Sequence, residues 1–320
     1  MIGLTLTLTP LTPFGTPPLG DTLFGQLCWA LRRRFGEARL SALLDGYADG
    51  QPFAVLSDAF PAGYLPRPAL PLAAFRISAG ADHKQLKRRT WIPAGAAGLP
   101  MEDWLAAAAP DSDAAGGMPF RREAVQPRNS IDRRTGTTGT GAFAPYGAAQ
   151  VWYAPGARLD CHVLLDEQRL ATEDLLAAVG DMGETGFGRD ANVGMGKFSV
   201  ASAPSTLPPP APGADALLTL APCAPQGCGF DPGRSFYHVF TRFGRHGDEA
   251  VLGGQPFKNP VLMARAGAVF AHPDATSRRF SGRGLGGGGE LSRALPATVQ
   301  QAYAPVLAVR LPAVAGGAGR

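Results

Sequence analysis

Residues 128–146 constrain the fold more than any other stretch, because they give a protein core almost nothing to bury. The segment, RNSIDRRTGTTGTGAFAPY, carries Arg128, Arg133 and Arg134 against a single acid, Asp132, and continues mainly in threonine and glycine. This composition predicts a surface arm or the tip of a hairpin. Arginine forks and threonine hydroxyls hold phosphates, and aromatic rings stack on bases. A solvated, mobile loop is the alternative that charge alone favours.

The composition of the whole chain predicts a globular protein. Of its 320 residues, 45% are hydrophobic and 18% are charged, which is enough for a sizeable core in one large domain or two smaller ones. No run approaches the ~18 consecutive apolar residues of a membrane span, and the first residues do not resemble a signal peptide. The cysteines at positions 28, 161, 223 and 228 lack zinc spacing. We therefore expect a cytoplasmic protein without a metal or another cofactor.

Charge is segregated along the chain, although the net charge is only +4 and the pI is about 9.0. Basic side chains gather in residues 82–89, 121–134 and 278–293, whereas acidic side chains gather in 102–113 and 166–184. Segregation of this kind predicts a basic face and a polyanionic partner.

A strand and a helix are expected at the start of the chain. Apolar and polar residues alternate over residues 2–9, which predicts a half-buried antiparallel strand. After a Pro/Gly loop, Asp21 occupies the position of an N-cap for a helix that continues to Phe35. The amides of the first turn, around Gly20, could hold a phosphate or could be satisfied by Asp21, and the sequence leaves both interpretations open.

Two segments ahead of the arm differ in character. Residues 84–91 combine Lys84, Lys87 and Arg88 with Trp91, which indicates either a surface that contacts a polyanion or an ordinary solvated helix face. Residues 94–117 are rich in alanine and glycine, acidic and low in complexity, so we expect a mobile insertion there.

A glycine-rich loop separates a predicted helix from a predicted strand in the second half of this region. It carries glycines at positions 180, 183, 186, 188, 194 and 196, together with Arg189 and Lys197. It is not a P-loop, which would need glycine in place of Ala191 and Ser or Thr in place of Phe198. A Rossmann turn would follow a strand instead of preceding one. We interpret the loop as a backbone-lined anion site, with a merely flexible loop as the alternative.

The predicted elements follow the order β-α-β-β-α-β, the ferredoxin-like or RRM-like plan, with the basic segment inserted. We assign this domain to residues 1–203, a proline-rich linker to 204–213 and a second, β-rich domain to 214–320. The second domain contributes two further candidate cations, Lys258 in PFKNP and Arg283 in GRGLGGGG. Its expected strands are residues 215–221, 235–243, 268–272 and 306–311.

Several segments together resemble a known family. They are FGTPPLGDTLFGQLCWALR, RNSIDRRTGTTG in the arm, GFGRDANVGMGKF in the glycine-rich loop, and the late segments PFKNPVLM, GRGLGG and QQAYAPV. In this order, and over nearly the whole chain, they are similar to the Csm-type member of the Cas five group. These are the RAMP proteins of type III-A CRISPR effector complexes. The arm is the most specific part of the resemblance, and residues 94–117 match nothing in it.

The resemblance implies an α+β fold of two ferredoxin-like (RRM-like) modules with antiparallel sheets and a thumb-like insertion at about residues 80–150. It implies a non-catalytic, RNA-binding subunit that anchors the repeat-derived 5′ tag of the CRISPR RNA (crRNA) in antiviral defence. The partners would be the crRNA, the nearby guide–target duplex, the large polymerase/cyclase-like subunit and a Csm-type backbone subunit. Ile131 or Phe143 would act as the wedge of the thumb, and residues 183–197 would touch the backbone of the tag.

The residue patterns and the resemblance together give one set of candidate RNA-binding residues. The set is Gly20, Asp21, Lys84, Lys87, Arg88, Arg128, Asn129, Ile131, Arg133, Arg134, Thr135, Thr137, Thr138, Phe143, Tyr146, Gly186, Phe187, Gly188, Arg189, Lys197, Lys258 and Arg283. We expect no catalytic residue and no metal ligand.

Three alternative functions stay open. A metal-independent endoribonuclease that processes repeat RNA would need a general acid or base, usually histidine, and His83 beside Lys84 is the histidine on a plausible RNA face. A pure protein scaffold would bind RNA, if at all, without sensitivity to salt. The equivalent subunit of another type III subtype would share the family's features. No G-x-S-x-G, H-E-x-x-H or paired-carboxylate motif indicates a different enzyme.

Overall fold

The alternating N-terminal pattern forms β1 (Ile2–Pro10), the centre of the first sheet in the computed structural model, which describes residues 1–252 and 255–313. Leu4, Leu6 and Leu8 of β1 are buried. β1 pairs antiparallel with both β8 (Leu159–Leu165) and β9 (Phe198–Pro204). With β2 (Ala54–Pro61), the sheet has the order β2-β8-β1-β9.

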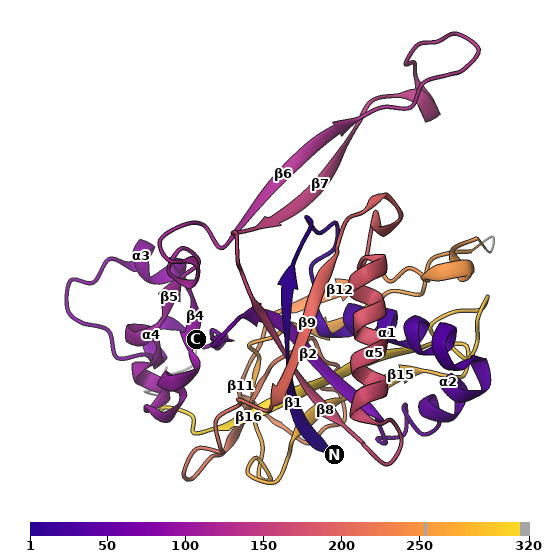
Figure 1. The fold of residues 1–320 in the computed structure, drawn as a ribbon. Coiled ribbons are helices and arrows are strands. Elements are labelled where there is room, and N and C mark those ends of the chain that lie inside the picture. The colour runs from indigo at the N-terminus through magenta and orange to yellow at the C-terminus, as the bar shows by residue number, and fades with distance from the viewer. Residues whose placement is uncertain (253–254, 314–320) are drawn as a thin grey trace.

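Helices α1 (Gly20–Phe35) and α5 (Thr172–Thr185) pack on this sheet, and α2 (Glu37–Leu44) packs on α1 (Figure 1). The apolar face of α1, with Phe24, Leu27 and Leu31, is buried in the same core as β1. The order β1-α1-β2-β8-α5-β9 agrees with the predicted β-α-β-β-α-β order. One detail was wrong: α1 has Leu19 rather than Asp21 at its N-cap.

The second half of the chain is rich in strands, as predicted. A five-stranded sheet has the order β11-β14-β10-β16-β15, and β12 pairs with β13 beside it. The described residues from 204 to 313, which exclude 253–254, contain no α-helix. They therefore do not display a second complete ferredoxin-like module. The last seven residues of the predicted second domain lie outside the described residues. The strands are β10 (Ala216–Thr219), β11 (Asp231–Phe236), β12 (Val239–Arg242), β13 (Val261–Ala264), β14 (Val269–Ala271), β15 (Phe280–Gly286) and β16 (Val299–Val309).

The two halves pack on each other through β16. The Gln301 side chain accepts the Leu56 amide at 2.9 Å and donates to the Leu56 carbonyl at 2.7 Å. The Tyr303 hydroxyl donates to the Tyr47 carbonyl at 2.8 Å, and both rings lie in the core below α1. The placement of a linker at residues 204–213 stays a prediction.

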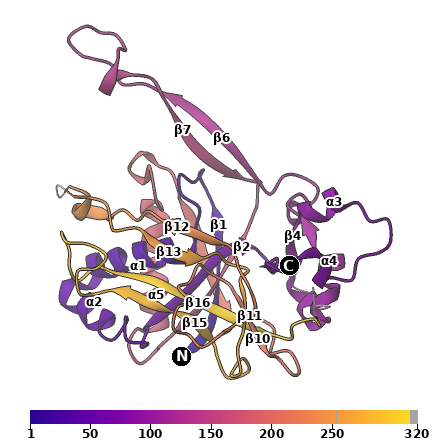
Figure 2. The same cartoon turned by 180° about the vertical axis from the view of Figure 1, so that it is seen from behind.

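The part of the chain between β2 and the arm forms a small lobe at one side of the body (Figure 2). The expectation of a mobile insertion at residues 94–117 was wrong, because Met101, Trp104 and Leu105 are buried in one apolar cluster with Leu218 and Leu307 of the second half. Its helices and strands are β3 (Tyr64–Pro66), α3 (His83–Arg88), β4 (Arg89–Pro93), α4 (Trp104–Ala107) and β5 (Ala109–Pro110), with 3-10 turns at Leu72–Ala74, Ala94–Gly98, Met101–Asp103 and Asp113–Ala115.

The arm is a two-stranded antiparallel hairpin that protrudes from the body (Figures 1 and 2). β6 (Arg121–Arg128) pairs with β7 (Tyr146–Tyr153) along its whole length. A 3-10 turn, Gly141–Phe143, lies at the tip. Across residues 1–252 and 255–313, no helix combines the length and the apolar character that crossing a membrane requires.

Candidate RNA interface

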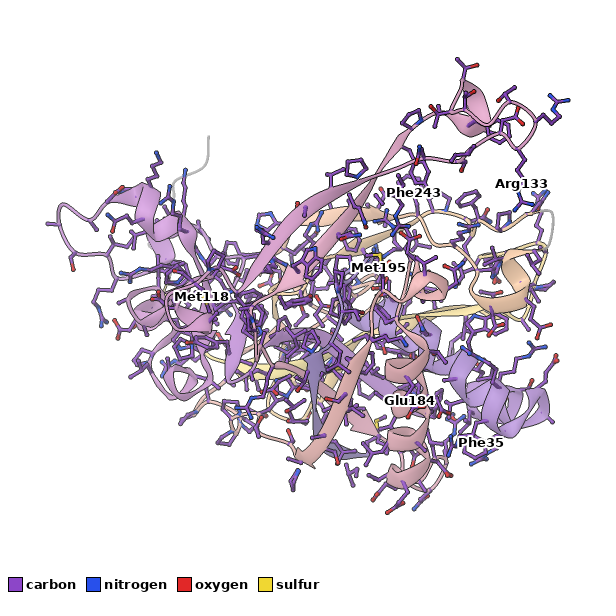
Figure 3. All side chains as sticks on the ribbon, turned by 45° about the horizontal axis from the view of Figure 1, so that its top comes forward. Phe35, Met118, Arg133, Glu184, Met195 and Phe243 are labelled. Carbon is purple, nitrogen blue, oxygen red and sulfur yellow. The ribbon has the colours of Figure 1, made fainter. Side chains whose placement is uncertain are left out.

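The tip of the arm is an ordered turn built around Asp132. The Asp132 amide donates to the Thr137 carbonyl at 3.0 Å, and the Asp132 carboxylate accepts the Arg134 amide at 2.9 Å. Arg133 and Arg134 are exposed, the Arg134 side chain to 91%, and Figure 3 shows Arg133 on the tip. The turn therefore presents two guanidinium groups to solvent at the end of the hairpin.

Most of the arm's candidate residues share this exposure. Ile131 is 57% exposed, Tyr146 53% and Phe143 36%. A phosphate chain or a base could reach these groups without any rearrangement of the core. The other exposed candidates on the arm are Asn129, Thr135, Thr137 and Thr138.

Arg128 is different, because it joins the arm to the body. Its Nη1 donates to Asp190 Oδ2 in the glycine-rich loop at 3.4 Å, and only 23% of its side chain is exposed. Among the ion pairs of the described residues, this one links the arm to the rest of the chain. The Arg189 guanidinium also donates to the Ala149 carbonyl of β7. Arg128 and Arg189 thus hold the arm in place, a role that sequence reasoning did not assign to them.

The root of the arm is fixed by main-chain pairing. Phe14, in the loop after β1, exchanges two hydrogen bonds with Val151 of β7, at 2.9 and 2.8 Å. A hollow of about 350 Å³ lies beside this pairing, lined in part by Pro17, Val125 and Arg189. The arm is therefore an extension of the body with a defined direction.

The glycine-rich loop is not an open, amide-lined anion site, which corrects our prediction. The amides of Gly186, Phe187, Gly188 and Arg189 already donate to groups of the chain. The glycines serve internal close approach: a Cβ at Gly196, where φ is +72°, would lie 2.2 Å from the Phe187 carbonyl oxygen. Phe187 itself is buried. Arg189 and Lys197 are the cations of this loop and are exposed, together with Asn192 and Val193.

Gly20 and Asp21 do not belong to an RNA surface either. The Gly20 amide donates to Asp58 Oδ1 at 2.8 Å, so a carboxylate from β2 satisfies the first turn of α1. Asp21 Oδ2 accepts Arg242 Nε at 2.7 Å, and the Asp21 side chain is only 1% exposed. Burial raises the pKa of Asp58 to about 8 and raises that of Asp21, which Arg242 opposes. This buried cluster binds α1 to β12 and leaves no free group for a phosphate.

The remaining candidate cations lie apart from the tip. Lys84, Lys87 and Arg88 are exposed on α3. This helix belongs to the small lobe, which lies on the opposite side of the arm's root from the arm's tip (Figures 1 and 2). Arg283 is exposed on β15. Lys258 is partly buried between the exposed residues Phe257 and Asn259, and this burial lowers its pKa.

The histidines His162 and His83 lie in opposite environments. His162 is buried, its Nδ1 lies 3.2 Å from Thr5 Oγ1, and burial lowers its pKa to about 4. His83 is exposed at the start of α3 but lies away from the arm's tip. No group of three or more potential metal ligands occurs within residues 1–252 and 255–313.

Sequence reasoning missed three exposed residues near Lys258. Phe243 is 74% exposed, Phe257 is 69% exposed, and Arg245 lies with its guanidinium carbon 5.8 Å from the centre of the Phe257 ring. The signal was present in PFKNP, because neighbouring residues of an extended segment point to opposite sides. A partly buried Lys258 therefore implies an outward Phe257.

No protein-family model matches the chain, and no curated protein matches its sequence. Solved structures do match its fold. A chain in the crystal structure of a Csm1–Csm4 cassette in complex with pppApA has a TM-score of 0.61 at 16% identity, over 98% of this chain and 100% of that chain. One in the cassette with cA4 has a TM-score of 0.60 at 16% identity, over 97% and 99%. One in a Csm3–Csm4 subcomplex of the type III-A CRISPR-Cas interference complex has a TM-score of 0.60 at 11% identity, over 97% and 100%.

At these identities the likeness establishes the fold, and it extends over nearly the whole of both chains. The α+β architecture with mostly antiparallel sheets is the one that the sequence resemblance implied. That resemblance is confirmed at the level of the fold: this chain has the fold of chains found in Csm1–Csm4 and Csm3–Csm4 assemblies.

Proposed function

We propose that this chain is the Csm4-like, non-catalytic RNA-binding subunit of a type III CRISPR effector complex. The observation that carries the proposal is the arm, which places Arg133 and Arg134 at the end of a fully paired hairpin. It is docked on a body whose fold matches chains of Csm assemblies over their whole length. Exposed guanidinium groups beside exposed rings suit the phosphates and bases of RNA.

In this proposal, the arm binds crRNA at its repeat-derived 5′ tag and reaches the nearby guide–target duplex. Arg133 and Arg134 neutralise phosphates, and the threonine hydroxyls of the tip donate to phosphate oxygens. Ile131 or Phe143 acts as the wedge between guide and target, because both are apolar and exposed on the tip. Lys197 and the basic α3 extend the RNA surface to either side of the arm.

The proposal also includes two protein partners. The matched structures are described as a Csm1–Csm4 cassette and a Csm3–Csm4 subcomplex. By analogy, this chain would bridge the large polymerase/cyclase-like subunit and a backbone subunit of its own complex. A ferredoxin-like module in the first half and a thumb belong to the same proposal, supported by the β-α-β-β-α-β order of the first half and by the arm. In this proposal the second half is a reduced module that keeps its sheet without helices over the described residues.

The first test is purification of the tagged protein from its host under gentle conditions. We expect small RNAs that share one constant 5′ end, together with a large polymerase-like protein and a repeated backbone subunit. The identity of these proteins also distinguishes type III-A from another subtype. A protein that purifies alone and free of RNA would contradict the proposal.

The second test measures RNA binding by the purified chain as salt is varied. Arg133→Gln with Arg134→Gln should weaken binding of a fluorescein-labelled single-stranded RNA. It should also lower the slope of log affinity against log salt by about 1.4, which is ~0.7 for each lost phosphate contact. Arg158→Gln with Arg310→Gln removes the same charge from exposed positions off the arm and is the matched control. Equal effects of the two double variants would remove the arm from the RNA site.

The non-catalytic part of the proposal has its own test. Repeat RNA incubated with the protein in EDTA should stay intact. A discrete cut that disappears in His83→Ala would overturn the non-catalytic assignment and favour the endoribonuclease.

A further inference from the structure

Two phenylalanine rings on the loop between β12 and β13 are exposed to solvent. Phe243 follows β12 directly and is 74% exposed, and Phe257 precedes β13 and is 69% exposed. Large rings kept exposed on an ordered backbone are typical of surfaces that stack on a ligand or close an interface. Neither ring takes part in the arm described above.

The backbone that carries these rings is paired across the loop. Arg245 and Phe257 form an antiparallel β-bridge, and the Lys258 amide donates to the Gly244 carbonyl at 2.9 Å. Side chains alternate along paired strands, and directly opposed residues share a face. Phe243, Arg245 and Phe257 therefore lie on one face, which we call the Phe243–Phe257 face.

The opposite side of this loop is anchored to the body. His246 is buried, and its Nε2 lies 2.8 Å from Ser292 Oγ. The Asn259 amide donates to the Leu291 carbonyl at 2.8 Å, and the Asn259 side chain donates to the Glu290 carbonyl at 2.6 Å. The loop is thus anchored to the body on the side opposite its exposed rings. The rings are therefore preorganised, and binding a ligand would cost little conformational entropy.

The charges around the Phe243–Phe257 face leave it positive. Asp248 and Glu249, the acids of this loop, are already held by arginines of α1: Arg33 Nε lies 2.9 Å from Asp248 Oδ2 and Arg32 Nη1 lies 2.9 Å from Glu249 Oε1. Arg245 forms no ion pair within the described part of the chain. Its guanidinium carbon lies 5.8 Å from the centre of the Phe257 ring instead. A cation beside two flat rings matches a nucleic acid strand better than an acidic or purely aliphatic partner surface.

We propose that the Phe243–Phe257 face is a second RNA contact, on which Phe243 and Phe257 stack bases of single-stranded RNA while Arg245 holds a neighbouring phosphate. This inference rests on the proposed RNA-binding function and extends it from the arm to the second half of the chain. The loop and the arm's tip project towards the same side of the molecule (Figures 1 and 2), and Figure 3 shows Phe243 and Arg133 on that side. A strand held by the tip could therefore continue across this face.

The test compares substitutions that keep or remove the flat rings. Phe243→Ala and Phe257→Ala should each weaken binding of a fluorescein-labelled, mixed-sequence single-stranded RNA by about 5- to 150-fold, the range expected for loss of base–aromatic stacking. Phe→Tyr at either position keeps the ring and should restore affinity, whereas Phe→Leu keeps apolar area without the ring and should not. Leu252→Ala, at an aliphatic position of the same loop that is 88% exposed, is the matched control and should bind as wild type does.

A salt series separates this inference from the proposed function. The ring substitutions should lower affinity without changing the salt slope, because they remove no phosphate contact, whereas Arg133→Gln with Arg134→Gln should lower the slope. If the arm variant loses affinity and the ring variants do not, the Phe243–Phe257 face is not an RNA contact while the proposed function stands. If wild type does not bind RNA, the proposed function itself fails. Ring variants that bind RNA normally but no longer co-purify with protein subunits would instead make this face a protein interface and overturn the inference.

Discussion

Replacing Asp190 by Asn should weaken RNA binding, although the change removes a negative charge beside the proposed RNA site. Asp190 Oδ2 lies 3.4 Å from Arg128 Nη1, and this pair joins the arm to the glycine-rich loop. Asparagine keeps the size of the side chain and tolerates the φ of 64° at this position. The substitution therefore loosens the docking of the arm without straining the loop, while the Phe14–Val151 pairing still holds its root. Long-range electrostatics alone would predict the opposite sign, because an anion near the path repels phosphates.

The magnitude follows from the distance and from the length of the arm. Two unit charges 3.4 Å apart attract by about 5 kcal/mol at an effective dielectric constant of ~20. Hydration and side-chain entropy offset most of this attraction and leave about 1 kcal/mol, or roughly a fivefold change in the docked population of the arm. Eight residues of strand span about 27 Å, so a pivot of about 10° at the root moves the tip by ~5 Å. That is more than a hydrogen-bond length, so we expect RNA affinity to fall by about three- to fivefold.

The assay is fluorescence anisotropy with single-stranded RNA, combined with hydrogen exchange of residues 121–153. Asp190→Asn and Arg128→Gln should each weaken binding and speed exchange in the arm. The double variant should bind no more weakly than Arg128→Gln alone, because the pair is already broken. Asp49→Asn removes an exposed acid in the turn after α2 and serves as the control for net charge. Binding by Asp190→Asn that is as tight as wild type, or tighter, would refute the docking role of this pair.

Three further predictions concern stability, each measured by urea unfolding. Deleting Thr135–Gly141, whose residues are all exposed, should leave the midpoint unchanged, and a loss of more than ~1 kcal/mol would show that the tip packs on the body. Arg242→Ala leaves the buried Asp21 carboxylate without its partner and should lower the free energy of unfolding by about 3–5 kcal/mol; a loss under ~1 kcal/mol would mean that Asp21 is tolerated without it. Burial raises the pKa of Asp58 from 3.8 to about 8. Between these pH values the folded chain therefore holds one more proton than the unfolded chain. The free energy of unfolding should then fall as pH rises, by up to ~1.4 kcal/mol per pH unit. Asp58→Asn keeps the acceptor for the Gly20 amide and should flatten this slope, whereas an unchanged slope between pH 5 and 8 would assign it to another group.

Local pattern predicted the frame of the fold well. The alternation over residues 2–9 is a property of one strand, and the apolar face of residues 23–31 is a property of one helix, so neither needs knowledge of distant residues. The arm could be predicted from the sequence equally well, because a segment with nothing to bury cannot enter a core. These features share one cause, which is that composition over a few residues decides their environment.

The errors arose where a distant residue decides the outcome. Asp21 has the sequence position of a helix cap, yet its partner is Arg242, 221 residues away, and the first turn of α1 is satisfied by Asp58. The glycines near Gly196 fit a ligand site by composition, yet the atoms that approach them belong to this chain. Residues 94–117 looked mobile because alanine and glycine dominate, but Trp104 and a few other large side chains suffice to attach the segment to the second half.

The pairing of charges, rather than their number, distinguishes the arginines that can meet RNA. Arg32 and Arg33 form a run as basic as that of the arm, but the fold brings Glu249 and Asp248 to within 2.9 Å of them. Arg133 has no ion-pair partner among the residues the structure describes, and it stands at the end of the hairpin. Positive charge is thus neutralised beside α1, whereas Arg133 is left unopposed at the end of the protruding hairpin. An approaching polyanion would meet the arm first, so in this arrangement salt should slow the association of RNA more than it speeds dissociation.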